Sequence, residues 1–468
     1  MTYSSRTYDS NTNTVILSHV ALYRICGENI SSMSETTSLT HHAAPTVQIR
    51  KKIVPLTSVR GICALIIYGF HALYDEGKIP LPFRCMASVV SFFFILSGFM
   101  MVWCYHHCDL SNWKCKGSFM VRRIARIYPA LIIIFASHFL FSLLLGHSEN
   151  WLFLVITTPL LIVSLTICNL DDPIIFFIHH WAVSVEFLFY VVFIFVFPFI
   201  RRSYDKVIHP GVSGLRWWTF WVLTPVLLYT WTVVPIFLPS PFKNWSCVRY
   251  FTFPMRFSEC FLGVWAGFVG LHYLHPAWSR ASATTKKFVG FTIDCFIIMV
   301  TVFISFVAPY MDEYHDVPFV RLLQTGMLSP VGVLVVFTLS LDVGLVAKLF
   351  HLRPLEVLGE ISYELYLLHQ FVVQGYSQLH VALGWALSRG SVFYLTMPYT
   401  FAASYFFARH ISEPLYHKIV AAVSHKYPQM KCNCKSHPPK PTPVDVDLEN
   451  RGLLNHLVHV HDVDEERS

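Results

Sequence analysis

Eleven apolar segments, each about as long as a bilayer-spanning helix, occupy the chain between residues 56 and 410. A helix needs roughly 20 mostly apolar residues to cross the hydrocarbon core, and helices satisfy their own backbone hydrogen bonds there. Charged residues make up 13% of the chain, against about 25% in soluble domains. The sequence therefore predicts an all-α, polytopic membrane helical bundle of about ten to eleven spans. The segments are 56–75, 87–105, 128–146, 151–168, 176–200, 217–238, 250–273, 288–309, 323–341, 359–381 and 391–410.

Basic residues between the segments indicate how the chain is threaded. If 128–146 and 151–168 together contribute one crossing, the loops on one side hold 14 Lys and Arg residues and those on the other side hold 6. Because positive loops stay in the cytosol, we expect a multi-pass membrane protein with ten crossings and both termini cytosolic. An internal membrane is expected if the organism is eukaryotic. The net charge of +7 is explained by this threading, so no nucleic-acid partner is expected.

The division into parts follows composition. We expect a mobile cytosolic N-terminal tail over 1–54, a membrane domain over 55–414 and a cytosolic C-terminal tail over 415–468, because neither tail could bury a core. Twelve cysteines are scattered along the chain, which predicts no disulfide framework. One cluster could hold zinc, but interfacial cysteines beside a basic loop are more often inert or lipidated, so no metal is expected. That cluster is Cys104, His106, His107, Cys108 and Cys115.

Charged groups inside a span are costly, and each is a candidate for function. The first segment contains Arg60 and His71, which lie roughly 16 Å apart along a helix. Arg123 and Arg126 share one helical face at the mouth of the third segment. Guanidinium groups bind phosphate oxygens in pairs. A donor with a phosphate-rich head and a long thin arm, such as an acyl-CoA thioester, could bind these arginines and reach His71. A neutral His71 could then act as general base. For each residue the alternative is structural: a topology signal, a lipid contact or a helix–helix hydrogen bond.

Two carboxylates lie deep in later segments. Glu186 is the second catalytic candidate, because it could orient His71 or bind the acceptor, although it could also pair with an arginine for structural reasons. Arg256 and Glu259 are three residues apart and are expected to pair with each other first, with an acceptor cavity as the second interpretation of Glu259.

Two further polar residues remain open between packing and an acceptor cavity. His369 lies deep in its segment. Ser97 stands beside Gly98, and small residues of this kind let spans approach closely.

Several stretches in this order resemble the membrane-bound acyltransferase 3 family, which includes relatives of bacterial O-antigen and peptidoglycan O-acetyltransferases. They include the Arg60 to His71 spacing and the Arg123-x-x-Arg126 pair. The matching stretches are residues 55–65, 70–71, 91–99, 122–129, 181–190, 358–369 and 412–414. The resemblance implies a cytosolic acyl-CoA donor as co-substrate, with no other cofactor, and essential roles for His71, Arg60, Arg123 and Arg126.

The chain departs from the family pattern at two positions. Thr57 stands where the family often has an aspartate, and Phe187 follows Glu186 where a second polar residue is frequent. The partner that orients His71 therefore stays open.

We expect O-acyl transfer from acyl-CoA to a hydroxyl of a small metabolite or a carbohydrate, with acetyl as the first candidate for the acyl group. Secondary-metabolite biosynthesis would fit, and N-acylation stays open. The alternatives are a polytopic transporter without acyl-transfer chemistry and an acyltransferase-like sensor that has lost activity. A transporter explains the buried charges. It does not explain why three arginines gather at a distance from His71 that the long arm of an acyl-CoA donor could span. No internal repeat supports an inverted-repeat transporter.

Overall fold

Helices make up the regular structure of the part of the chain that the computed structural model describes, and this part contains no strand. The described residues are 52–73, 80, 83–144, 155–166, 168, 180–208, 214–237, 245–313, 328–384 and 389–426. The first half contains α2 (Val54–Leu73), α3 (Met86–Tyr105), α4 (Trp113–Leu144), α6 (Val163–Thr166), α7 (His180–Ile208), α8 (Gly214–Trp218), the π-helical turn η4 (Thr219–Leu223) and α9 (Thr224–Phe237). The second half contains α10 (Trp245–Phe251), α11 (Phe253–Val269), η5 (Gly270–Leu274), α12 (His275–Arg280), α13 (Ala283–Glu313), α15 (Ser329–Ser340), α16 (Gly344–Phe350), α17 (Arg353–Glu360), α18 (Ser362–Ala382), α19 (Arg389–Phe406), η6 (Phe407–Ser412) and α20 (Glu413–Lys426).

A helical membrane bundle is confirmed, but ten to eleven spans are not. Among the described residues, seven helices are long and apolar enough to cross a bilayer, or eight if the bent pair α15 and α16 forms one span. The helix α18 falls short because it buries polar side chains, including Glu364, His369 and Gln370, inside the bundle. The described residues 155–166 form short helical turns.

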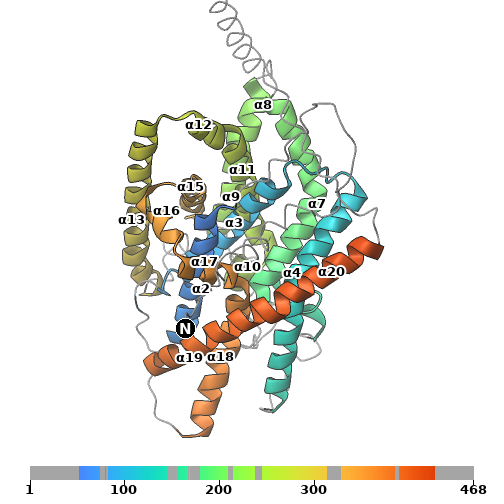
Figure 1. Cartoon of the computed structure of the whole chain (residues 1–468), viewed down its shortest axis with the longest axis vertical. Coiled ribbons are helices and arrows are strands. Elements are labelled where there is room, and N and C mark those ends of the chain that lie inside the picture. Colours follow the sequence, from blue (N-terminus) through green and yellow to red (C-terminus); the bar gives the residue numbers. More distant parts are fainter. Residues whose placement is uncertain are drawn as a thin grey trace, which may run out of the picture.

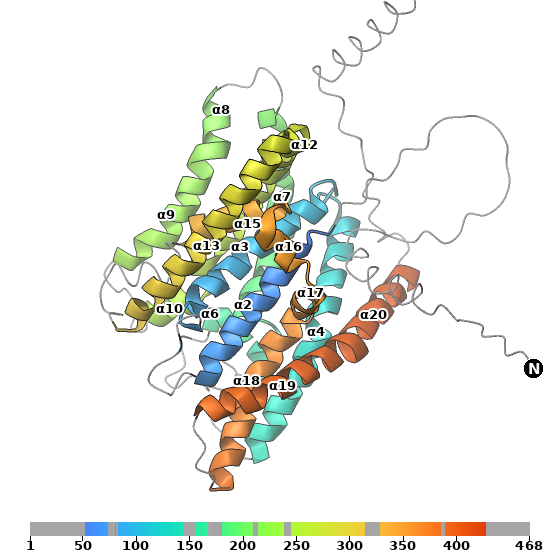
Figure 2. The same cartoon turned by 60° about the vertical axis from the view of Figure 1, so that its left-hand side comes forward.

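The helix α2 lies at the centre of the bundle, with α3 on one side and α18 on the other (Figure 2). Its neighbour α3 packs most extensively against α11. At their crossing a β-carbon on Gly98 would lie 1.9 Å from the Cys260 carbonyl oxygen, and one on Gly263 would lie 2.0 Å from the Ile95 carbonyl oxygen. Only glycine permits this approach, so the expectation that Gly98 serves close packing agrees with the structure.

The short helix α17 packs equally closely against the first turns of α2. A β-carbon on Gly359 would lie 2.0 Å from the Thr57 carbonyl oxygen. Beside it, the Ser58 hydroxyl donates a hydrogen bond of 2.6 Å to the Phe350 carbonyl. Thr57 therefore lies at the opposite end of α2 from His71, roughly 21 Å away for 14 residues of helix. A carboxylate at position 57 could not have oriented His71.

The structure continues past residue 414 with α20 to Lys426, and this helix lies across α4 (Figure 1). One feature differs from the sequence expectations. No disulfide framework was expected, but Cys168 is bonded to Cys247. This bond joins the segment after α6 to α10. The sequence did not reveal this pair among its twelve scattered cysteines, because 79 residues separate the two partners.

Candidate active site

A cavity of about 310 Å³ opens between α2, α3, α4, α7, α17, α18 and α20. Its walls bring together residues from Lys52 to His417, because α17 packs against α2 and α20 packs against α4. The lining is strongly basic, with six Lys and Arg residues against three glutamates. The basic residues are Lys52, Arg60, Arg122, Arg123, Arg126 and Arg409. The three arginines predicted to bind a phosphate-rich donor therefore share one cavity.

Arg60 is available to a ligand. It extends from the second turn of α2, half-buried, and makes no hydrogen bond or ion pair with any residue in the described part of the chain. The guanidinium nevertheless lies in the field of Glu186, Glu364 and Arg126. A guanidinium without a direct partner in a cavity wall has all its donors free for an incoming anion.

Arg123 and Arg126 are held in different ways. The guanidinium of Arg123 lies 5.1 Å from the ring centre of Tyr190, 5.2 Å from that of Phe119 and 5.3 Å from that of Tyr105. These cation–π contacts fix its position without using its donors. Arg126 faces Glu364 at 3.5 Å, a long contact. Both side chains can thus donate hydrogen bonds into the cavity.

Glu186 lies within the arginine-lined part of the cavity. Its Oε1 accepts a hydrogen bond of 3.1 Å from Ser97 and a short one from Tyr190, one turn further along α7. Ser97 also lines the cavity, so it combines a place in the cavity wall with its packing position beside Gly98. Tyr190 was not among the residues predicted from the sequence, although its i, i+4 spacing from Glu186 could have revealed it.

His71 lies just beyond the deep end of this cavity. Its Nδ1 is 2.9 Å from the Ile67 carbonyl oxygen and 3.3 Å from Nε2 of His369. The cavity lining includes Ile67, one helical turn before His71, but neither His71 nor His369. Along α2, Arg60 thus lines the cavity, and His71 follows about three helical turns later, outside the lining. His369 lies against His71 and not in this cavity.

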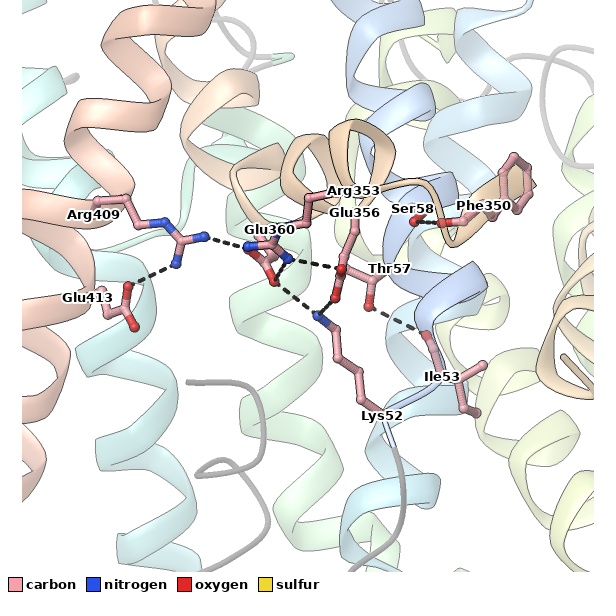
Figure 3. Close-up of polar contacts among 10 residues, drawn as sticks. All are labelled: Lys52, Ile53, Thr57, Ser58, Phe350, Arg353, Glu356, Glu360, Arg409 and Glu413. Carbon is pink, nitrogen blue, oxygen red and sulfur yellow. Dashed lines mark hydrogen bonds and ion pairs between the residues drawn. The ribbon is translucent and has the colours of Figure 1, made fainter. Parts of the chain in front are cut away.

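The mouth of the cavity carries an ionic cluster that sequence reasoning did not find (Figure 3). Lys52 Nζ lies 2.7 Å from Glu356 and 3.0 Å from Glu360. On its other side Glu360 contacts Arg409, whose guanidinium also reaches Glu413 at 3.2 Å. Glu360 thus joins Lys52, two residues before α2, to Arg409 in η6, and Arg409 in turn contacts Glu413 of α20. In the chain, Glu360 is 308 residues from Lys52 and 49 residues from Arg409. No local spacing could therefore signal the cluster.

The charge of Glu356 depends on this cluster. Burial acts to raise the pKa of its carboxyl, but the hydrogen bonds from Lys52 and Arg353 outweigh burial and lower the pKa below its ordinary value of 4.5. Glu356 is therefore ionised at neutral pH and holds the start of α2 against α17.

Two sets of candidates lie outside the cavity. Glu259 pairs with Arg256 at 3.0 Å and accepts a hydrogen bond of 2.9 Å from Ser91, all three buried. Its first interpretation, as the partner of Arg256, agrees with the structure. Among the described residues no three His, Cys, Asp or Glu side chains gather in a metal-binding arrangement. Of the five residues considered for zinc, Cys108 is disulfide-bonded.

Comparison with known proteins assigns the chain to a family. A family model for an acyltransferase domain, acyltransferase 3, matches residues 56–409. The peptidoglycan O-acetyltransferase OatA of Listeria monocytogenes serovar 1/2a (strain ATCC BAA-679 / EGD-e) is 24% identical over 360 residues, which cover 70% of this chain and 50% of OatA. Acyltransferase MdmB of Streptomyces mycarofaciens is 30% identical over 167 residues, covering 32% of this chain and 41% of MdmB.

The chain thus spans about half the length of these curated relatives, or less. No solved structure matches it significantly. The family model covers most of the chain, including the cavity residues from Leu56 to Arg409. On this evidence the chain is a multi-pass membrane protein that belongs to the acyltransferase 3 family.

Proposed function

We propose that this protein transfers an acyl group, of which acetyl is the simplest, from acyl-CoA to a hydroxyl of a small metabolite or a carbohydrate. The single observation that carries the proposal is the cavity that gathers Arg60, Arg123 and Arg126 at one end and stops one helical turn short of His71. The relatives that are named O-acetyltransferase and acyltransferase support the reaction class.

The donor would bind with its phosphates among the arginines. Phosphate oxygens suit guanidinium forks, and six cations against three carboxylates leave the lining positive. Arg60 and His71 are roughly 16 Å apart along α2, a span that the extended pantetheine arm of a CoA thioester can cover. The thioester carbonyl would then lie near His71. We also propose that this mouth and both chain termini face the cytosol, where acyl-CoA is found, in agreement with the excess of basic residues in the loops on that side.

The chemistry follows from a neutral imidazole. His71 takes the proton of the acceptor hydroxyl as the oxygen attacks the thioester carbonyl carbon. The new ester bond forms, the carbon–sulfur bond breaks, and the CoA thiolate leaves with the proton that His71 then returns. Glu186 would help hold the donor end of the site through Ser97 and Tyr190, which it already contacts.

The test separates binding from chemistry in the full-length protein purified in detergent. Wild type is expected to bind CoA and to consume acetyl-CoA, measured as free thiol. His71→Ala should bind CoA with unchanged affinity but lose consumption by about a hundredfold or more, whereas Arg60→Gln should weaken CoA binding. Equal consumption by His71→Ala and wild type, or no CoA binding by wild type, would overturn the proposal. Metabolite profiling of a deletion strain, in search of a compound lighter by one acyl group, would then identify the acceptor.

A further inference from the structure

Two imidazoles from different helices meet at the deep end of α2. His71 Nδ1 lies 3.3 Å from Nε2 of His369, and the two ring centres are 5.0 Å apart. His369 is the eighth residue of α18 and is completely buried, whereas His71 is half-buried.

The carbonyl partners determine which nitrogen of each ring carries the proton. Nδ1 of His369 lies 2.6 Å from the Tyr366 carbonyl oxygen. Since a carbonyl only accepts, this Nδ1 must donate, and Nε2 of the neutral ring is left as an acceptor. Nδ1 of His71 lies 2.9 Å from the Ile67 carbonyl oxygen and must donate as well. The Nδ1–H of His71 is therefore shared between the Ile67 carbonyl and Nε2 of His369. Nε2 of His71 keeps its lone pair.

We propose that His369 is the positioning residue for His71: it accepts the Nδ1 proton and so presents Nε2 of His71 as the base. This inference rests on the proposed function, in which His71 accepts the proton of the acceptor hydroxyl. In many enzymes a carboxylate does this work by holding the imidazole in one tautomer and orientation. Here an acceptor nitrogen without charge takes that place, so the membrane interior does not have to hold a buried anion.

The arrangement also stabilises the protonated state that forms during transfer. When Nε2 of His71 takes the acceptor proton, the ring becomes a cation, and its Nδ1–H then donates a charge-assisted hydrogen bond to His369. No other atom moves, because both acceptors already lie in place. His369 itself never needs to gain or lose a proton.

The experiment compares substitutions at His369 with a matched control on α2 in the full-length protein. His369→Phe keeps a ring but removes the acceptor, and we expect kcat for acetyl-CoA consumption to fall at least about tenfold, with KM unchanged. His369→Gln places an amide oxygen near the former Nε2 and should recover most of the loss. The control is Tyr68→Phe, three residues before His71. Tyr68 is equally buried and donates 2.7 Å to the Phe393 carbonyl, so its loss should lower thermal stability and leave kcat unchanged.

The outcomes separate this inference from the proposed function. If His71→Ala is inactive but His369→Phe has wild-type kcat, the positioning role of His369 is wrong while the proposed function stands. If His369→Gln is as slow as His369→Phe although both unfold at the wild-type temperature, the acceptor role is also wrong. Should His369→Phe fail to accumulate, the comparison of His369→Gln with His369→Leu decides in the same way. A wild type that does not consume acetyl-CoA refutes the proposed function itself.

Discussion

The buried pair of Arg256 and Glu259 allows a quantitative test of whether Glu259 serves structure or an acceptor cavity. In Glu259→Ala the Arg256 guanidinium stays buried without its counterion, and breaking such a pair costs about 3–5 kcal/mol. Arg256 keeps a hydrogen bond of 2.8 Å to the Tyr250 carbonyl and lies 4.6 Å from the Tyr250 ring centre. These retained contacts place the expected loss of unfolding free energy at the lower end, about 3 kcal/mol. Ser91, which loses its acceptor, adds to this cost.

Two further variants sharpen the test. Glu259→Gln keeps an acceptor for Ser91 and Arg256 and should cost only about 1 kcal/mol. The double variant Arg256→Met, Glu259→Leu removes both charges and should be more stable than Glu259→Ala alone. The assay is unfolding by SDS in mixed micelles, followed by tryptophan fluorescence, together with KM for the acceptor once it is known. If Glu259→Ala unfolds like wild type but raises that KM, the structural interpretation is refuted and the acceptor-cavity interpretation returns.

Three other substitutions address the donor site, the mouth and the core. Arg123→Lys loses the planar group that lies among three aromatic rings, so KM for acyl-CoA should rise about tenfold in steady-state assays; an unchanged KM would contradict its role in binding. Because the lowered pKa of Glu356 lies below 4.5, its ion pairs contribute stability above pH 4.5 that is lost as the pH falls through the lowered pKa. Thermal unfolding of Glu356→Gln should therefore depend less on pH below 4.5 than that of wild type, and parallel curves would refute this. Gly98→Val should prevent accumulation of folded protein, since even a β-carbon would lie 1.9 Å from a carbonyl oxygen of α11; a normal yield in membranes would show that the two helices can separate.

Much of the fold was predictable because the bilayer imposes a strong length rule. Of the predicted segments, 56–75 and 87–105 coincide within two residues with α2 and α3. The number of spans was less predictable. Segments 359–381 and 391–410 do form helices, but several of their polar residues, among them Glu364, His369 and Thr396, are buried in protein. A hydropathy rule cannot distinguish a polar residue buried in protein from one exposed to lipid.

The candidate site was likewise predictable from the sequence only in part. Arg123 and Arg126 could be predicted to act together because a spacing of three residues places them on one helical face, and both line the same cavity as Arg60. The contact between His71 and His369 joins residues 298 positions apart. Helical periodicity gives the face on which each ring lies but not which helices are neighbours, so the sequence left the partner of His71 open. The same reason hid Arg409, which lines the cavity from η6, where this turn packs beside α4.

The ionic cluster at the mouth has a consequence for biosynthesis. Glu360 takes one cation from Lys52, before the first span, and another from Arg409, after the last long helix. During translation the first partner enters the membrane long before the second leaves the ribosome. A nascent chain stalled before residue 409 therefore has an incomplete wall around the donor cavity and a carboxylate without one of its cations. Elements synthesised late, η6 and α20, thus close the compartment that α2 begins.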